Sequence, residues 1–135
     1  MGKNKNQIDV IPIPTKCRYC GSDVVFTSNA EIYGREYGNG KCYLCRNCMA
    51  FVGVHTGTTM PLGTLANDDL RKARNKAHNE FDKLWKQPTR IMKRLDCYKW
   101  LSKEMGLKLE ETHIALFEVE QCEKVVELVK KKINK

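Results

Sequence analysis

The chain has 135 residues, a mass of 15.6 kDa and a formal charge of +8, with 24 Lys and Arg residues against 16 Asp and Glu. It contains no run of roughly 18 apolar residues, which excludes a protein with a membrane-spanning helix. Its first residues lack the apolar segment of a signal peptide, so we expect a cytoplasmic protein. Disulfides do not persist in that reducing compartment, so the seven cysteines are expected to be buried, catalytic or metal-bound rather than cross-linked.

We expect three parts along the chain. Residues 1–14 are predicted to form an extended arm, because Ile11 and Ile13 alternate with prolines, which favour extended backbone. Residues 15–60 hold five of the seven cysteines and are predicted to form a zinc module. Residues 61–135 show the 3.6-residue apolar period of helices and are predicted to form a helical subdomain.

Two Cys-x-x-Cys pairs, Cys17 with Cys20 and Cys45 with Cys48, are separated by 24 residues. Two intervening residues let both thiolates of a pair reach one zinc ion at about 2.3 Å, and two such pairs complete a tetrahedron. Gly21 follows the first pair and permits the tight turn of a zinc knuckle. Because a four-cysteine site has no position for water, the predicted cofactor is one structural zinc ion without a catalytic role.

One alternative concerns the second pair of ligands. Cys42 and Cys45 also form a Cys-x-x-Cys pair, and zinc could use them instead of Cys45 and Cys48. We favour Cys48, because the apolar run 49–54 that follows it suits a strand leaving a knuckle. His55 is a further candidate ligand, but it is expected to end that strand.

Short apolar runs in the zinc module predict strands at 24–27, 31–33, 42–44 and 50–54. Glycines and an asparagine between residues 34 and 40 indicate the tip of a hairpin. Strands and knuckles in this order are typical of a zinc ribbon.

The helical period predicts helices over 67–87, 91–105 and 118–133, joined by a short turn or helix at 107–117. Pro88 limits the first helix and Gly106 ends the second. The predicted fold is therefore α+β: an N-terminal zinc ribbon of short antiparallel strands, followed by a C-terminal subdomain of three to four helices.

The sequence resembles an uncharacterised family of zinc-finger-containing proteins from phages, prophages and bacteria. The resemblance covers residues 17–126 and rests on an ordered set of motifs, which comprises Cys17-x-x-Cys20, Ala30–Gly38, Cys45-x-x-Cys48, Val52–His55, Pro61–Asn67, Phe81–Trp85, Tyr98–Leu101 and Thr112–Ile114. It implies a zinc ribbon fused to helices, a mobile-element origin and, for a phage protein, the host cytoplasm. It implies no activity. Here Met49 stands where the family often has glycine, and Arg46 where it often has proline.

The first functional hypothesis is binding of DNA or RNA, or docking on a complex that processes them. Residues 67–105 contain eleven basic and six acidic side chains, a local charge of +5. Such a surface binds phosphates with a steep salt dependence. Trp100 and an aromatic-basic hairpin with Tyr33, Arg35 and Tyr37 could stack on bases. The candidate basic contacts are Lys72, Lys76, Lys83, Lys86, Arg90 and Lys93.

The second hypothesis is a protein-interaction module that modulates a host protein, such as a polymerase or defence complex. The third is a metal-dependent nuclease that uses its histidines together with Asn67 and Asp82, because His78 and Asp82 lie one helical turn apart. The three histidines are His55, His78 and His113. No nucleophile elbow, phosphate-binding loop or zinc-protease motif is present, so we assign no catalytic residue and no small-molecule substrate.

Overall fold

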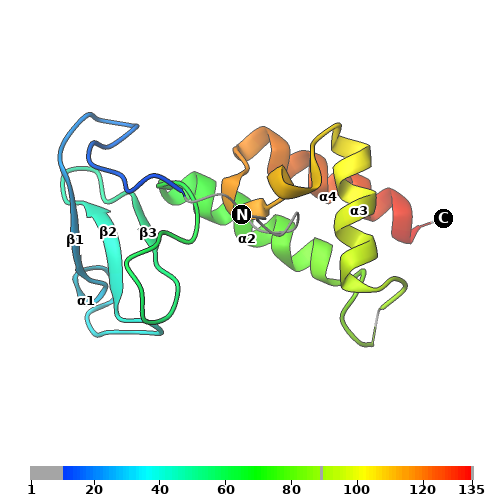
Figure 1. Cartoon of the computed structure of the whole chain (residues 1–135), viewed down its shortest axis with the longest axis horizontal. Helices are drawn as coiled ribbons and strands as arrows, with labels where there is room; N and C mark the ends of the chain where they lie inside the picture. The colour runs from blue at the N-terminus through cyan, green and yellow to red at the C-terminus, as the bar shows by residue number, and fades with distance from the viewer. Residues whose placement is uncertain (1–10, 89, 135) are drawn as a thin grey trace, which may run out of the picture. The chain divides into compact units, whose positions relative to one another are not determined.

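The computed structural model describes residues 11–88 and 90–134. The chain divides into two compact units, which we call the zinc unit, residues 10–69, and the helical unit, which contains residues 70–135. Strands occur in the first and three long helices follow, so the predicted α+β class is confirmed (Figure 1). Most of the predicted arm lies outside the described residues, and its described end includes the buried Ile11.

The zinc unit contains one three-stranded antiparallel sheet with the order β1-β2-β3. The strands are β1 (Val24–Ser28), β2 (Lys41–Cys45) and β3 (Phe51–Gly53), as the sequence predicts. In the hairpin of β1 and β2, Val24 pairs with Cys45 at one end and Ser28 with Lys41 at the other. The cysteine pairs therefore lie at the first end of this hairpin, and the connection 29–40 lies at the second.

The strand predicted at 31–33 is wrong, because this segment is the single-turn helix α1 (Ala30–Tyr33). The turn is closed by Gly34, which has a φ of 84° and donates its backbone N–H to the oxygen of Ala30 at 2.8 Å. A left-handed residue at this position is the common way to end a helix. The Glu31 carboxylate also pairs with Arg46, at 2.9 Å from Nε to Oε1, which ties the helix back to the end of β2.

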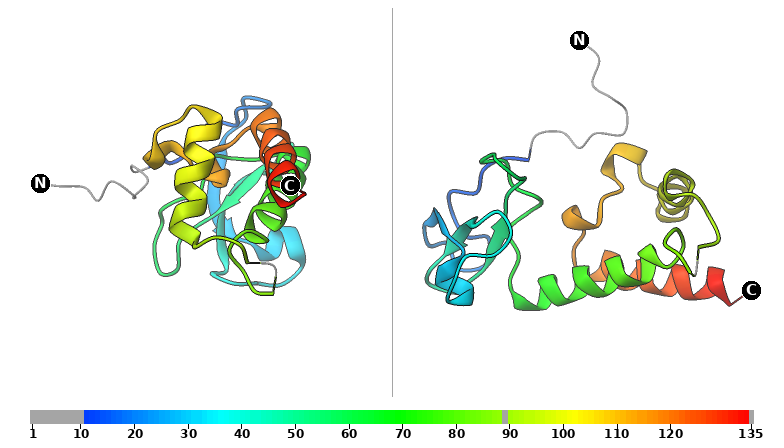
Figure 2. Two further views of the ribbon diagram at one scale, coloured as in Figure 1. Left: turned by 90° about the vertical axis from the view of Figure 1, so that its right-hand side faces the viewer. Right: turned by 90° about the horizontal axis from the view of Figure 1, so that it is seen from below.

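The helical unit contains α2 (Asp68–Asp82, whose first two residues belong to the zinc unit), α3 (Arg94–Met105) and α4 (Val119–Ile133). Two short 3-10 helices, η1 (Leu109–Glu111) and η2 (Ile114–Leu116), connect α3 to α4. Figure 2 shows α2 and α4 side by side. No helix in the described part of the chain is long and apolar enough to span a bilayer.

The helix ends follow local hydrogen bonding. Gly106 ends α3 as predicted, with a φ of 67°. The α4 helix begins after Glu118, whose backbone N–H is accepted by Oε1 of Gln121 at 2.9 Å. The α3 helix starts later than predicted, because Ile91 and Met92 both donate their N–H groups to the oxygen of Leu84, at 2.9 Å. These two bonds fold the chain back onto the end of α2 and prevent a helix from starting at residue 91.

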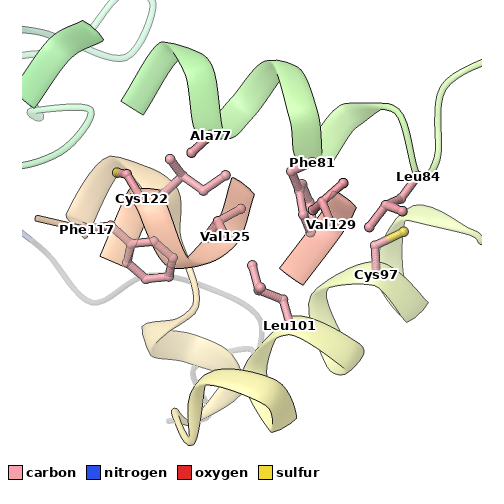
Figure 3. Packing of buried hydrophobic residues seen from close by; sticks show 10 residues of the cluster. Ala77, Phe81, Leu84, Cys97, Leu101, Phe117, Cys122, Val125 and Val129 are labelled. Carbon is pink, nitrogen blue, oxygen red and sulfur yellow. The ribbon is translucent and has the colours of Figure 1, made fainter. Parts of the chain in front are cut away.

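The core of the helical unit is assembled from all three long helices. Figure 3 shows Phe81 of α2, Leu101 of α3 and Val125 of α4 among the side chains that fill it. Ten buried residues form this cluster, and half-buried Trp85 packs against it. Burying a large apolar side chain contributes about 1.5–3 kcal/mol, so this unit has a core of its own.

Candidate metal centre

The four predicted cysteines lie together in the zinc unit. The sulfur atoms of Cys17, Cys20, Cys45 and Cys48 are all within 4.8 Å of one another. The Cys17 sulfur is 3.4 Å from that of Cys48, and the Cys20 sulfur is 3.5 Å from that of Cys45. The contacts cross between the two pairs, so one centre joins the chain before β1 to the turn between β2 and β3.

The first knuckle is built by two backbone hydrogen bonds. Cys17 donates its N–H to the oxygen of Ser22 at 2.8 Å, and Gly21 donates to the oxygen of Cys17 at 2.9 Å. Gly21 has a φ of 78°, in the left-handed region that favours glycine. The N–H of Tyr19 points to the Cys17 sulfur at 3.4 Å. The turn therefore directs a backbone donor towards a metal ligand.

The second knuckle repeats the first with one substitution. Cys45 donates its N–H to the oxygen of Ala50 at 2.9 Å, and Met49 donates to the oxygen of Cys45 at 2.7 Å. Met49 occupies the place of Gly21 and has a φ of 67°. Left-handed backbone costs a residue with a side chain about 1–2 kcal/mol. The second knuckle therefore contains strain that the first one lacks.

The sulfur positions fit a tetrahedral zinc ion. Metal–sulfur bonds of about 2.3 Å in a tetrahedron place the sulfurs about 3.8 Å apart. The distances above, together with 3.7 Å between the sulfurs of Cys45 and Cys48, lie close to this value. Cys17 and Cys45 are buried, whereas Cys20 and Cys48 are exposed. The arrangement suits a closed structural site near the surface, with no position for a reacting group.

Hydrogen bonds to the sulfur atoms stabilise the thiolate form, which is the form that binds a metal ion. The Asn47 side chain, followed by the side chain and N–H of Ser22, lowers the pKa of the Cys20 thiol to about 5. At Cys48 the Ala50 N–H lowers the pKa, but the neighbouring sulfurs and desolvation outweigh it and raise the pKa to about 12. Four thiolates this close together need a cation, and zinc supplies its two positive charges there.

Cys42 is not part of the centre. It lies in β2 opposite Thr27 and Gly53, and only 1% of its surface is exposed. Burial and then the nearby Glu31 raise the pKa of its thiol, so it remains protonated. His55 follows β3 and is also outside the cluster. Within residues 11–88 and 90–134, the four cysteines are the only group of three or more Cys, His, Asp or Glu side chains close enough to hold one metal ion.

A three-stranded antiparallel sheet with a four-cysteine centre at the ends of its strands defines a structural zinc-binding module. Residues 13–132 match the family model of a zinc-finger-containing domain. The chain therefore belongs to this family and binds one structural zinc ion. Neither the curated proteins nor the solved structures that were compared gave a match.

The predicted basic contacts all lie at the surface of the helical unit. Lys83 pairs with Glu80 at 3.0 Å and Lys86 with Asp82 at 3.3 Å. Exposed pairs of this kind contribute only about 0–1 kcal/mol, so a phosphate can replace them. The exposed basic residues are Lys72, Lys76, Lys83, Lys86, Arg90 and Lys93.

Trp100 and Arg35 have different surroundings. Trp100 is half-buried against the helical core, and Lys132 Nζ lies 5.1 Å from the centre of its ring. Arg35 is exposed in the zinc unit and stacks on Tyr37. Arg35 is therefore available to a ligand, whereas much of Trp100 is covered.

Among the residues that the structure describes, those of the nuclease hypothesis do not form a metal cluster. His55 is in the zinc unit, whereas His78 and His113 are in the helical unit. The Asp82 carboxylate accepts the indole N–H of Trp85 at 3.1 Å. These contacts give Asp82 a structural role at the end of α2.

Two features of the site were not predicted. Asn47 and Ser22 bond to Cys20, and the only sequence signal was a short polar residue within or just after a cysteine pair. Arg94, which begins α3, places its guanidinium carbon 5.4 Å from the Trp85 ring centre. The sequence shows Arg94 directly after Lys93, but it does not show that the turn between α2 and α3 brings Arg94 to Trp85.

Proposed function

We propose that this zinc-binding protein binds nucleic acid through the basic surface of its helical unit. The supporting observation is how charge divides between the units. Residues 70–135 contain 17 basic and 10 acidic side chains, whereas residues 10–69 contain five of each. Four thiolates and one zinc ion add about −2 to the second group. The attraction for phosphates therefore comes from the helical unit.

The turn between α2 and α3 concentrates this charge around one aromatic ring. Lys86 Nζ lies 5.2 Å from the ring centre of Trp85, and Arg94 approaches the same ring. Arg90 and Lys93 are exposed in the same turn, and among the residues that the structure describes neither forms an ion pair. Four cations within nine residues offer several phosphate contacts without first breaking strong internal pairs.

The test measures binding of labelled single- and double-stranded DNA and RNA by fluorescence anisotropy, at about 50 to 200 mM salt. We expect affinity to fall steeply with salt. The double variant Arg90→Gln, Lys93→Gln should bind more weakly, with a slope of log K against log salt reduced by about 0.7 per lost contact on single strands.

The matched control is Lys103→Gln, Lys108→Gln, which removes the same charge. Lys103 is nine residues after Arg94 in α3, about 14 Å along the helix axis. The control should retain most of the affinity. Absence of binding at low salt, or an equal loss in both double variants, would contradict the proposal.

Docking on a protein complex that handles nucleic acid is the second candidate function. The knuckles favour it, because Tyr19 and Met49 are 39% and 43% exposed beside the metal ligands. Tyrosine and methionine are enriched in protein interfaces. If the zinc-loaded protein binds no nucleic acid, a pull-down comparing it with a Tyr19→Ser, Met49→Ser variant tests this candidate. Equal recovery of every protein by both forms would reject it.

A further inference from the structure

Two exposed tyrosines stand on the connection between β1 and β2. Tyr33 is 50% exposed and Tyr37 is 48% exposed. Their rings meet edge to face, with 5.4 Å between centres. Together with Asn29 and Gly38 they line an open hollow of about 480 Å³. We call residues 29–40 the tyrosine loop.

The tyrosine loop is held in one conformation by its own polar groups. Asn29 Nδ2 donates to the oxygen of Tyr37 at 2.8 Å, and Asn29 Oδ1 accepts the N–H of Tyr37 at 3.1 Å. The Asn29 N–H also donates to the oxygen of Gly40 at 3.0 Å. Phe51 of β3 supports the Tyr33 ring from the sheet, at 6.1 Å between centres. A ligand therefore meets rings that are already ordered, which reduces the entropy cost of binding.

Arg35 extends this aromatic surface. Its guanidinium carbon lies 4.8 Å from the Tyr37 ring centre, and its Nε donates to the Tyr37 hydroxyl at 2.9 Å. The loop also carries two carboxylates, and both have partners within the zinc unit. Glu31 pairs with Arg46, and Glu36 accepts a hydrogen bond from Ser28 at 2.7 Å. Guanidinium and tyrosine planes are both surfaces on which nucleobases stack.

We propose that the tyrosine loop stacks unpaired bases, so that the protein prefers single-stranded nucleic acid; this inference rests on the proposed function. Bases are available for stacking on side chains only where they are unpaired. The zinc unit has five basic and five acidic residues and gains negative charge with its metal, so it contributes little phosphate attraction. Stacking releases few counterions, and its contribution is therefore independent of salt.

The experiment compares the full-length, zinc-loaded protein with Tyr33→Ala, Tyr37→Ala in the same salt series. We expect this variant to lose at least about fivefold in affinity for single strands, because one stacked base contributes about 1–3 kcal/mol. Its salt slope should equal that of the unmodified protein, and its affinity for duplex should be unchanged. The variant Arg90→Gln, Lys93→Gln should instead reduce the slope on both substrates.

The control Tyr33→Phe, Tyr37→Phe keeps the rings and should retain single-strand affinity, although it loses the Arg35 bond to the Tyr37 hydroxyl. Zinc content, measured for each variant, shows whether the zinc unit is intact. Unchanged single-strand affinity in a zinc-loaded alanine variant would overturn the inference while leaving the proposed function in place. An equal loss on single strands and duplex would also overturn it. Failure of the unmodified protein to bind any nucleic acid would overturn both proposals.

Discussion

Replacing Met49 with glycine should strengthen zinc binding. Met49 has the left-handed backbone that Gly21 has in the first knuckle, and it costs about 1–2 kcal/mol there. Glycine removes this strain but adds about 0.5–1 kcal/mol of backbone entropy to the unfolded chain. Met49 is 43% exposed and is not among the buried residues of the zinc-unit core. The net stabilisation is about 0.5–1 kcal/mol.

Because zinc binding and folding of a small zinc module are coupled, this gain should appear in the zinc affinity. A competition titration against a chromogenic chelator should show about two- to fivefold tighter binding by Met49→Gly. The reverse change, Gly21→Ala, isolates the backbone term, because a Cβ at Gly21 would meet no atom within 4 Å. It should weaken zinc binding by about two- to fivefold, because the strain of about 1–2 kcal/mol is reduced by the same 0.5–1 kcal/mol of unfolded-chain entropy.

Each of these two substitutions can refute one part of the reasoning. Weaker zinc binding by Met49→Gly would show that the methionine side chain stabilises the knuckle through contacts that outweigh its strain. Unchanged binding by Gly21→Ala would show that left-handed backbone is not costly in these turns. A circular dichroism spectrum of each zinc-loaded variant confirms that the protein is folded before affinities are compared.

Three further predictions concern the two units separately. Cys17→Ser should abolish stoichiometric zinc binding and unfold the zinc unit, whereas Cys42→Ser should retain one zinc ion per chain. Mass spectrometry of the metal content measures both results. Loss of zinc from Cys42→Ser would reject the ligand assignment. Arg74→Met should destabilise the helical unit by about 1.5–3 kcal/mol in urea unfolding, because Nε of the buried Arg74 donates to the oxygen of Phe117 at 3.0 Å. A smaller effect would mean that a water molecule replaces this hydrogen bond. Burial, followed by Arg94, lowers the pKa of His113 below its usual 6.5, so the unfolded chain takes up its proton first as pH falls. The stability of the helical unit should therefore decrease below about pH 6.5. The melting temperature of His113→Phe should fall less than that of the unmodified protein between about pH 7.5 and 5.5. An unchanged pH dependence would exclude His113 as the source of the effect.

The metal centre was predictable because its chemistry is local. Two Cys-x-x-Cys pairs place four thiolates within reach of one ion whatever connects them, and the apolar run after Cys48 indicated the correct strand. Gly106 similarly indicated the end of α3. In each case the signal and the structure it produces are within a few residues.

The predictions from the sequence failed where contacts between residues that are distant in the sequence determine the local structure. Residues 31–33 have the apolar pattern of a strand, but the Arg46 ion pair and the left-handed Gly34 favour a helical turn. The late start of α3 depends on two N–H groups that bond to Leu84. The burial of Arg74 in α2, four residues after Leu70, was not predicted, because charged side chains are seldom buried. In the folded helical unit the Phe117 oxygen accepts a hydrogen bond from the Arg74 guanidinium at 3.0 Å.

The separate cores imply that metal depletion acts on half of the molecule. The core of the zinc unit has seven buried residues and two of them are metal ligands, whereas none of the ten core residues of the helical unit is. Removal of zinc would therefore leave a chain with a folded C-terminal half and an unfolded N-terminal half. The five Lys and Arg residues of the zinc unit would then be open to trypsin-like proteases. The lifetime of the protein in the presence of proteases would thus depend on the supply of zinc.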